Sequence, residues 1–248
     1  MYKLVILDLD GTAIPNKKDG MPSKRLINVI KKIKNKIYVS AATGRAITSS
    51  RRIIKSLNLN SPCIISGGTQ IIDPETEKIL WEKDLDELQV EKIMQIAREY
   101  PYSVFFNEDT IGTPAKEKII KGTERIIYIE PVTKEDTVAI LNQLKTISNI
   151  TAHEVISWTP NHFDIHITHS EATKRHSLEI LLDMLKVYKN EVVAIGDSNN
   201  DLPLFEVAGY KIAMKNGSDE LKKMADMIAP PVDEDGVAIV LEKLFAGY

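Results

Sequence analysis

Short apolar runs alternate with amphipathic segments along the first part of the chain. The runs Leu4–Leu7, Ile37–Ala41 and Cys63–Ser66 have the length and composition of buried strands. Between them, residues 21–34 and 45–57 place apolar side chains at helical spacing, and Pro22-Ser23 is a typical helix start. Strands that alternate with helices in this way are typical of βα units that build a parallel sheet.

The same alternation returns toward the C-terminus. Four leucines at positions 178, 181, 182 and 185 form one stripe of a predicted helix, and Val192–Ile195 is a predicted buried strand. A further helix is expected to begin at Leu202 and to continue through Val207. Both ends of the chain are therefore expected to belong to one α/β domain with a parallel sheet.

Residues 79–168 have a different pattern. Helices are predicted at about 88–99 and 134–147, and strands at about 102–106, 125–130 and 163–168. Two helices with flanking strands favour a small α+β domain. We therefore predict an α/β core made of residues 1–83 and 169–248, with an inserted α+β domain over residues 84–168.

Composition and charge exclude several classes of protein. The 248 residues carry a net charge of −3, which provides no general attraction to nucleic acid or to an anionic membrane. No apolar stretch approaches the roughly 18 residues that a membrane span needs. The single cysteine, Cys63, excludes an internal disulfide and lies in an apolar run, so a buried structural thiol is expected. We expect a cytoplasmic protein, monomeric or homodimeric, without nucleic-acid or membrane partners.

Two aspartates follow the first predicted strand. Asp8 and Asp10 are spaced i, i+2, which in a strand puts both side chains on one side, about 6.6 Å apart along the chain. Gly11 then allows a sharp exit from the strand. The alternative is a polar turn, because Asp-Gly is common in turns. Taken alone, the motif does not favour one interpretation over the other.

A second acidic cluster, Asp197 and Asp201 within the run from Gly196, follows another buried strand. Ligands of a parallel sheet collect at the carboxyl ends of its strands, so both clusters are expected in one crevice. Converging carboxylates repel one another unless a cation lies among them, and an all-oxygen site suits Mg²⁺. The alternative is a helix cap before Leu202.

A third strand end carries Thr43-Gly44-Arg45. A hydroxyl and free N–H groups at a helix N-terminus bind phosphate oxygens readily. Threonine is also a good N-cap, and by itself this motif favours the cap.

Together these motifs resemble the haloacid-dehalogenase-like phosphatases, and among them the Cof-type and archaeal phosphoglycolate-phosphatase-like members. The matching segments occur in order along the chain: Asp8-Leu9-Asp10-Gly11-Thr12, Thr43-Gly44-Arg45, Lys174, and Gly196-Asp197-Ser198-Asn199-Asn200-Asp201. The C-terminal segments Ala213-Met214-Lys215-Asn216 and Asp233-Glu234-Asp235-Gly236-Val237 are also similar. The resemblance implies a Rossmann-like core, with the inserted segment as a cap domain over the active site.

The resemblance also implies a mechanism and a set of site residues. Asp8 would be the nucleophile that forms a phosphoaspartyl intermediate, and Asp10 the general acid and base. Mg²⁺ would be held by Asp8, the backbone carbonyl of Asp10, Asp197 and Asp201. A small phosphomonoester, a sugar phosphate or a phosphoglycolate-like compound, would be bound by the substrate-binding group, which comprises Thr43, Gly44, Lys174 and Asn200.

Lys174 has an alternative, because Arg175 is adjacent and either cation could reach a phosphate. We favour Lys174, since the leucines that follow it would then bury a helix that starts at the sheet edge. Alternatives for the whole chain are a receiver-like phosphoacceptor module and a catalytically inactive binding protein with the same fold. A dinucleotide-binding enzyme is disfavoured, because no G-x-G-x-x-G follows a strand.

All five histidines lie between His153 and His176. Strict alternation in residues 163–168 places Phe163, Ile165 and Ile167 inward, and Asp164 and His166 on the other face. A zinc site is the alternative to a polar strand face. If the insertion is a cap, its polar candidates for setting substrate preference are Asn107, Glu108, Lys116, Lys118 and His166.

Overall fold

The protein, seen here in a computed structural model, folds as two compact units, and all residues except 18, 108, 110 and 248 are described. Unit 1 comprises Met1–Trp81 and Lys174–Tyr248, and unit 2 comprises Glu82–Thr173. The predicted insertion, residues 84–168, begins later and ends earlier than unit 2. At its C-terminal end the last strand continues to His169, and the turn after it still belongs to unit 2.

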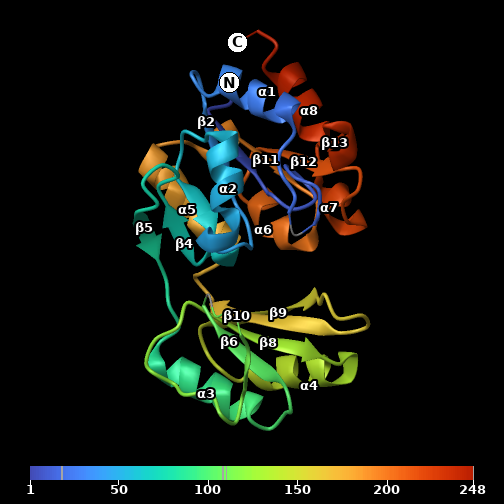
Figure 1. Cartoon of the computed structure of the whole chain (residues 1–248). Coiled ribbons are helices and arrows are strands. Elements are labelled where there is room, and N and C mark those ends of the chain that lie inside the picture. The colour runs from blue at the N-terminus through green and yellow to red at the C-terminus, as the bar shows by residue number, and fades with distance from the viewer. Residues whose placement is uncertain (18, 108, 110, 248) are drawn as a thin grey trace. The chain divides into compact units, whose positions relative to one another are not determined.

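Unit 1 is built on a five-stranded parallel sheet (Figure 1). Its strand order is β13-β12-β11-β1-β2, and each neighbouring pair is parallel. The strands are β1 (Leu4–Leu7), β2 (Tyr38–Ala41), β11 (Val192–Gly196), β12 (Tyr210–Met214) and β13 (Met227–Ala229). The central strands β1 and β11 thus come from opposite ends of the chain, and their carboxyl ends lie side by side.

Helices cover both faces of this sheet, because its central strands are apolar on both sides. Val5 and Leu7 pack in one core with α1 (Lys24–Ile33), α2 (Ile47–Leu57) and α8 (Gly236–Leu244). Leu4 and Ile6 pack in the other core with α5 (Lys174–Leu185), α6 (Leu202–Phe205) and α7 (Asp219–Met224). The predicted α/β, Rossmann-like architecture is confirmed.

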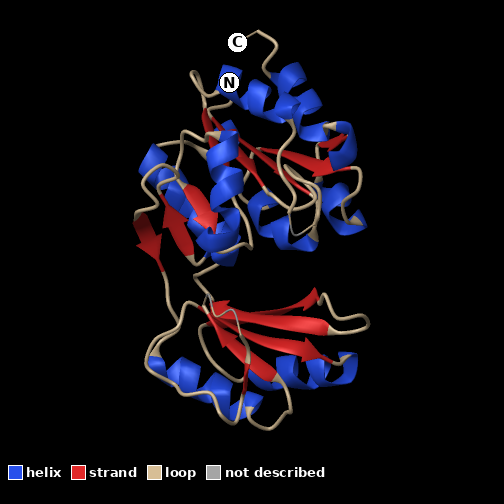
Figure 2. Cartoon of the chain, viewed as in Figure 1, coloured by secondary structure: helices blue, strands red, loops and turns tan. Residues whose placement is uncertain are grey.

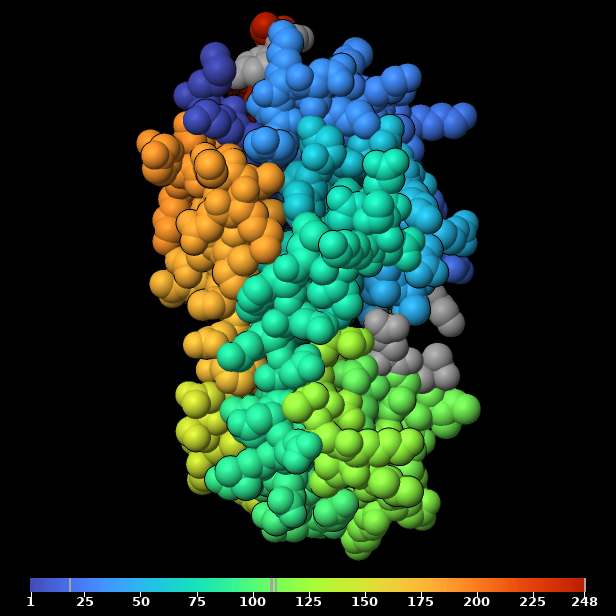
Figure 3. All heavy atoms as spheres, turned by 90° about the vertical axis from the view of Figure 1, so that its left-hand side faces the viewer, coloured from blue at the N-terminus to red at the C-terminus, as the bar shows by residue number. Residues whose placement is uncertain are grey.

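The third predicted strand does not join this sheet. Strand β3 (Cys63–Ile65) pairs antiparallel with β4 (Gln70–Ile72), which is followed by β5 (Ile79–Glu82) in a separate three-stranded sheet. Only a single parallel bridge, Ala42 to Ile64, links β3 to the end of β2. Figure 3 shows the teal segment that includes β5 on the surface, in agreement with the exposure of Ile79 and Leu80, whereas β4 is buried.

Unit 2 is an antiparallel sheet with two helices on one face (Figure 2). The strand order is β7-β6-β8-β10-β9. The strands are β6 (Ser103–Phe106), β7 (Thr113–Pro114), β8 (Ile126–Val132), β9 (Ile150–Ile156) and β10 (Phe163–His169). Helices α3 (Glu87–Ala97) and α4 (Lys134–Leu144) bury their apolar sides against Ile127, Ile129, Ile165 and Ile167.

Four short 3₁₀ turns complete the secondary structure of the described residues: η1 (Ser66–Gly68), η2 (Lys189–Glu191), η3 (Asn199–Asp201) and η4 (Val232–Glu234). Among the helices in the described part of the chain, none has the length and apolar content needed to cross a membrane.

Candidate active site

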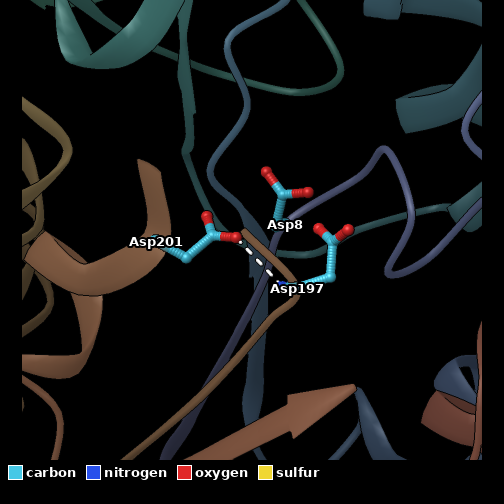
Figure 4. Close-up of side chains that lie close together, drawn as sticks. All are labelled: Asp8, Asp197 and Asp201. Atoms are coloured by element: carbon cyan, nitrogen blue, oxygen red, sulfur yellow. Dashed lines mark hydrogen bonds between the residues drawn. The ribbon is translucent and has the colours of Figure 1, made fainter. Parts of the chain in front are cut away.

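Three aspartates meet where β1 and β11 end. Asp8 follows β1, Asp197 follows β11, and Asp201 ends η3; one carboxylate oxygen from each lies within 4.8 Å of the others. Figure 4 shows the three side chains gathered at these strand ends. Their approach follows from the topology, since the two central parallel strands pair from Leu4–Val192 to Leu7–Ile195 and end together. Among the described residues, no other group of three acids, histidines or cysteines comes this close.

Lys174 lies among these carboxylates. Its Nζ donates to Asp8 Oδ1 and to Asp201 Oδ1, each at 2.7 Å, and the residue is only 3% exposed. Burial alone would lower the pKa of Lys174, but the charges of Asp201 and Asp8 raise it above the usual lysine value. Lys174 is therefore a buried cation. Arg175, the alternative considered above, is instead at the surface, where it pairs with Glu206.

Burial and neighbouring charge raise the pKa values of Asp8 and Asp197. Burial and then the charge of Asp201 raise the pKa of Asp8, while Lys174 lowers it. The pKa of Asp197 is raised to about 7 by burial and by Asp201. One ammonium group does not balance three carboxylates that lie so close together. The donor set therefore fits a hard divalent cation such as Mg²⁺, which prefers oxygen ligands and adds the missing positive charge.

Asp201 does not cap α6, the helix for which its motif offered a cap, because its side chain makes no capping hydrogen bond there. It does close a capping box on η3, where it accepts the N–H of Ser198, the N-cap of that turn. Asp201 Oδ2 accepts the N–H groups of Asp197 and Ser198, each at 3.1 Å, and the residue is fully buried. These bonds orient the loop that carries Asp197. Asn200 is exposed on the same turn, and its Oδ1 accepts a hydrogen bond from Ser198 Oγ.

Asp10 lies apart from this acidic group and pairs with Arg45. Arg45 Nε donates to Asp10 Oδ2 at 2.7 Å, and Nη2 donates to Asp10 Oδ1 at 2.5 Å. Such a two-point contact between guanidinium and carboxylate fixes both side chains. The expectation that Asp8 and Asp10 share one side of a strand does not apply, because β1 ends at Leu7 and both residues lie beyond it. Asp10 contributes no side-chain oxygen to the acidic group.

Thr43 and Gly44 lie in the loop between β2 and α2. Thr43 is 1% exposed, its N–H donates to Ile64 O, and its Oγ1 accepts the N–H of Arg45. The alternative role of Thr43 as an N-cap is wrong, because α2 begins at Ile47 and its N-cap is Ala46. A Cβ added at Gly44 would have no atom within 4 Å, so this glycine leaves open space at the loop.

Sequence reasoning missed two contacts that hold this site together. Thr12 Oγ1 donates to Asp197 Oδ1 at 3.2 Å, and the side chain of Asn216 donates to Gly11 O at 2.9 Å. Both link residues about 200 positions apart, and no local pattern reports such pairs. Their only signal in the sequence is that Thr12 and Asn216 lie in segments that resemble the family.

The histidine-rich strand of unit 2 is not a zinc site among the described residues, since no group of three ligands forms there. The rings of His166 and Tyr128 meet edge to face. Burial, followed by the charge of His153, lowers the pKa of His166 to about 3, so this histidine is neutral. The predicted alternation holds for Ile165 and Ile167, which lie in the core of unit 2, whereas Phe163 is only partly buried and lies outside that core. Asp164 is buried although the alternation predicts it on the other face of the strand.

The polar residues named as candidates for substrate preference all belong to unit 2. Asn107 is used within the unit, because its Nδ2 donates to Glu124 and its Oδ1 accepts the N–H of Arg125. Lys118 pairs with Asp109 and lies over the ring of Phe106, and Lys116 is exposed. Glu108 is outside the described residues.

Comparisons with known proteins identify the family and similar relatives. The family described as haloacid dehalogenase-like hydrolase matches residues 5–241. "Phosphoglycolate phosphatase 1" of Saccharolobus solfataricus is 27% identical over 100% of this chain and 97% of its own length. "Phosphoglycolate phosphatase" of Methanopyrus kandleri is 28% identical, covering 98% and 97%.

Solved structures show the same fold. A haloacid dehalogenase-like hydrolase from Bacteroides thetaiotaomicron superimposes with a TM-score of 0.81 at 24% identity, covering 99% of this chain and 100% of that one. Another from Bacillus subtilis gives a TM-score of 0.82 at 21% identity, covering 98% and 100%.

Proposed function

The chain belongs to the haloacid dehalogenase-like hydrolases, and on that basis we propose that it is a magnesium-dependent phosphatase of a small phosphorylated metabolite that works through a phosphoaspartyl intermediate. The observation that carries the proposal is the meeting of Asp8, Asp197 and Asp201 with Lys174 at the ends of β1 and β11. The names of relatives, phosphoglycolate phosphatases among them, support a small organic phosphate as substrate. The receiver-like alternative is wrong, because the family match extends across the second acidic cluster.

Asp8 is proposed as the nucleophile. Its carboxylate oxygen attacks phosphorus, the bond between phosphorus and the leaving oxygen breaks, and that oxygen takes a proton from Asp10. Water then attacks the phosphorus of the phosphoaspartyl group and gives a proton to Asp10. The bond between phosphorus and Asp8 breaks, which releases phosphate and restores the Asp8 carboxylate.

The acidic group and Lys174 set the charge that surrounds the reacting phosphate. Asp8, Asp197 and Asp201 would hold the magnesium ion, with the backbone carbonyl of Asp10 as a further oxygen. A bound magnesium ion would supply positive charge to the phosphate oxygens. Lys174 neutralises part of the acidic group and lowers the pKa of Asp8, which favours the ionised form that attacks. We place Thr43, Gly44 and Asn200 at the transferred phosphate, because Gly44 leaves room for its oxygens.

Asp10 must separate from Arg45 before it acts as an acid. Both of its carboxylate oxygens face the Arg45 guanidinium, so the side chain must turn before one of them can reach the leaving oxygen. When Asp10 turns toward the leaving oxygen, Arg45 becomes available for phosphate oxygens.

Arg45→Met is expected to lower kcat/KM for a small aryl phosphate by about tenfold or more, equivalent to ~1.4 kcal/mol of barrier. Arg51→Met is the matched control, because Arg51 lies on α2 and makes the same two-point pair with Glu77 at the surface, at 2.8 and 2.6 Å. The control should retain activity within about threefold. Equal activity of the two variants would remove Arg45 from the reaction.

The metal assignment is tested by calorimetric titration of Mg²⁺ into the substrate-free protein. Asp197→Ala is expected to weaken Mg²⁺ binding by at least about tenfold, because it removes one of the three carboxylates that would hold the ion. Mg²⁺ should also raise the melting temperature of the wild type more than that of the variant.

Asp183→Ala serves as the control, since Asp183 is an exposed residue of α5 outside the acidic group. It should bind Mg²⁺ as the wild type does. If Asp197→Ala bound Mg²⁺ with the affinity of this control, Asp197 would not be a ligand.

A further inference from the structure

Asn216 uses both ends of its side-chain amide to join three segments of unit 1. Nδ2 donates to Gly11 O at 2.9 Å, and Oδ1 accepts the N–H of Val232 at 3.0 Å. A flipped amide would face a carbonyl with its oxygen and an N–H with its nitrogen, so only one orientation satisfies both partners. Asn216 therefore connects the loop after β12 both to the loop that carries Asp8 and Asp10 and to the start of η4.

The backbone that Asn216 holds lies directly against Asp197. Gly11 has φ +78°, and a Cβ placed on it would come within 2.2 Å of Asp197 Oδ2. The next residue, Thr12, donates from Oγ1 to the other oxygen, Asp197 Oδ1, at 3.2 Å. A shift of the peptide between Gly11 and Thr12 would therefore change both the space and the hydrogen bond available to this carboxylate.

The other side of Asp197 is held by the residues that follow Asn216. Ser218 N–H donates to Asp197 O at 2.8 Å, and a Cβ added at Gly217 would lie 2.5 Å from the same carbonyl oxygen. Asp197 is thus enclosed between Gly11–Thr12 and Gly217–Ser218. Asn216, adjacent to one of these segments and bonded to the other, sets the distance between them.

We propose that Asn216 is a positioning residue that fixes the Asp197 carboxylate in the orientation required to bind Mg²⁺. The inference rests on the proposed function, since it takes Asp197 as a metal ligand. Groups that orient metal ligands typically change metal affinity by 10- to 100-fold when they are removed. The two side-chain hydrogen bonds of Asn216 go to Gly11 O and to the N–H of Val232, and neither bond reaches an aspartate of the acidic group.

Asn216→Ala removes both hydrogen bonds and is expected to weaken Mg²⁺ binding to the substrate-free protein by about tenfold, measured by calorimetry. It should also lower kcat more than it changes KM. Asn199→Ala is the matched control, because Asn199 lies on the neighbouring turn and accepts only from Ser218 Oγ in the described contacts. The control should bind Mg²⁺ with wild-type affinity.

Asn216→Asp separates the two bonds. It keeps an acceptor for the Val232 N–H but has no donor for Gly11 O, and its added negative charge would by itself attract Mg²⁺. Weaker Mg²⁺ binding in this variant would identify the bond to Gly11 as the important one. If Asn216→Ala does not fold, Asn216→Asp and Asn216→Ser are measured in its place.

Unchanged Mg²⁺ affinity in the folded Asn216 variants, with a lower melting temperature only, would overturn the inference and leave Asn216 a structural residue. Asp197→Ala distinguishes this result from failure of the proposed function. If Asp197→Ala loses Mg²⁺ affinity and the Asn216 variants do not, only the inference about Asn216 fails. If neither loses affinity, the proposed metal site itself is wrong.

Discussion

Asp8→Asn is expected to reduce phosphate release from a small aryl phosphate by at least about 10³-fold. An amide is a poor nucleophile toward phosphorus and a weak ligand for Mg²⁺, so the substitution removes the proposed covalent step and one metal ligand together. The geometry of the side chain is retained, because the Asn oxygen can still accept a hydrogen bond from Lys174 Nζ, which lies 2.7 Å from Asp8 Oδ1.

The same variant should remain folded and should be as stable as the wild type or more stable when no metal is added. Asp8 is 4% exposed, and its charge is repelled by Asp201 and Asp197, so a neutral group of the same shape relieves that repulsion. Thermal unfolding measures this second readout. Asp183→Asn, at the exposed position of α5, is the control for both measurements. Turnover of Asp8→Asn within tenfold of this control would contradict the nucleophile assignment.

Lys174→Met should cause the largest loss of stability. The substitution leaves Asp8 and Asp201 buried with no ammonium group between them, and removing one partner of a buried ion pair typically costs about 3–5 kcal/mol. Phosphatase activity should fall with it, because the repulsion that Lys174 offsets would act on the nucleophile. Chemical denaturation followed by circular dichroism measures the free energy of unfolding.

Two comparisons show whether the loss of stability comes from removing the buried charge or from any substitution at the start of α5. Arg175→Met changes the neighbouring cation, which is exposed and pairs with Glu206, so it should cost less than about 1 kcal/mol. Mg²⁺ should restore part of the stability of Lys174→Met, because a cation bound among the acids stabilises the folded state. A loss no greater than that of Arg175→Met would show that Lys174 is not the counter-ion of the acidic group.

The strand and helix pattern of unit 1 could be predicted because its elements are apolar on sides that the topology buries. The strand over residues 4–7 and the leucine stripe of α5 are confirmed, and Leu178, Leu181 and Leu182 are buried. The predicted helix start at Pro22-Ser23 is confirmed as well, because Ser23 Oγ accepts the N–H of Leu26 and caps a helix that begins at Lys24. The second helix begins at Ile47, two residues later than predicted.

Strand β9 was not predicted, because it is an edge strand whose burial does not alternate. Along Ile150–Ile156 the side chains change from partly buried to exposed and do not alternate, so the sequence lacks the period-two pattern that predicts a strand. Strand β3 was predicted, but its pairing was wrong: the short turn at Ser66–Gly68 reverses the chain into β4, and an apolar run alone does not indicate a parallel or an antiparallel partner.

In the candidate site, the meeting of Asp8 with Asp197 and Asp201 follows from two acidic strand ends in one parallel sheet, and it could be expected from the residues alone. Lys174 could not, since a lysine at a helix start has no pattern of its own, and it came from the family resemblance. The pairing of Asp10 with Arg45 depends on how two loops bend after their strands, and neither loop has a periodic pattern that reports its shape.

Unit 2 is joined to unit 1 at two points that are close together in space. Trp81 is the last residue of unit 1 before the insertion, and its ring lies 6.3 Å from that of His176, two positions after Lys174. Evolution could therefore lengthen, shorten or exchange the inserted segment without breaking the sheet, since the chain returns where it left. Lys174 is the first residue of α5, so helix α5, and not the inserted segment, places it among the aspartates. Changes in the length or sequence of the inserted segment would therefore leave Lys174 paired with Asp8 and Asp201.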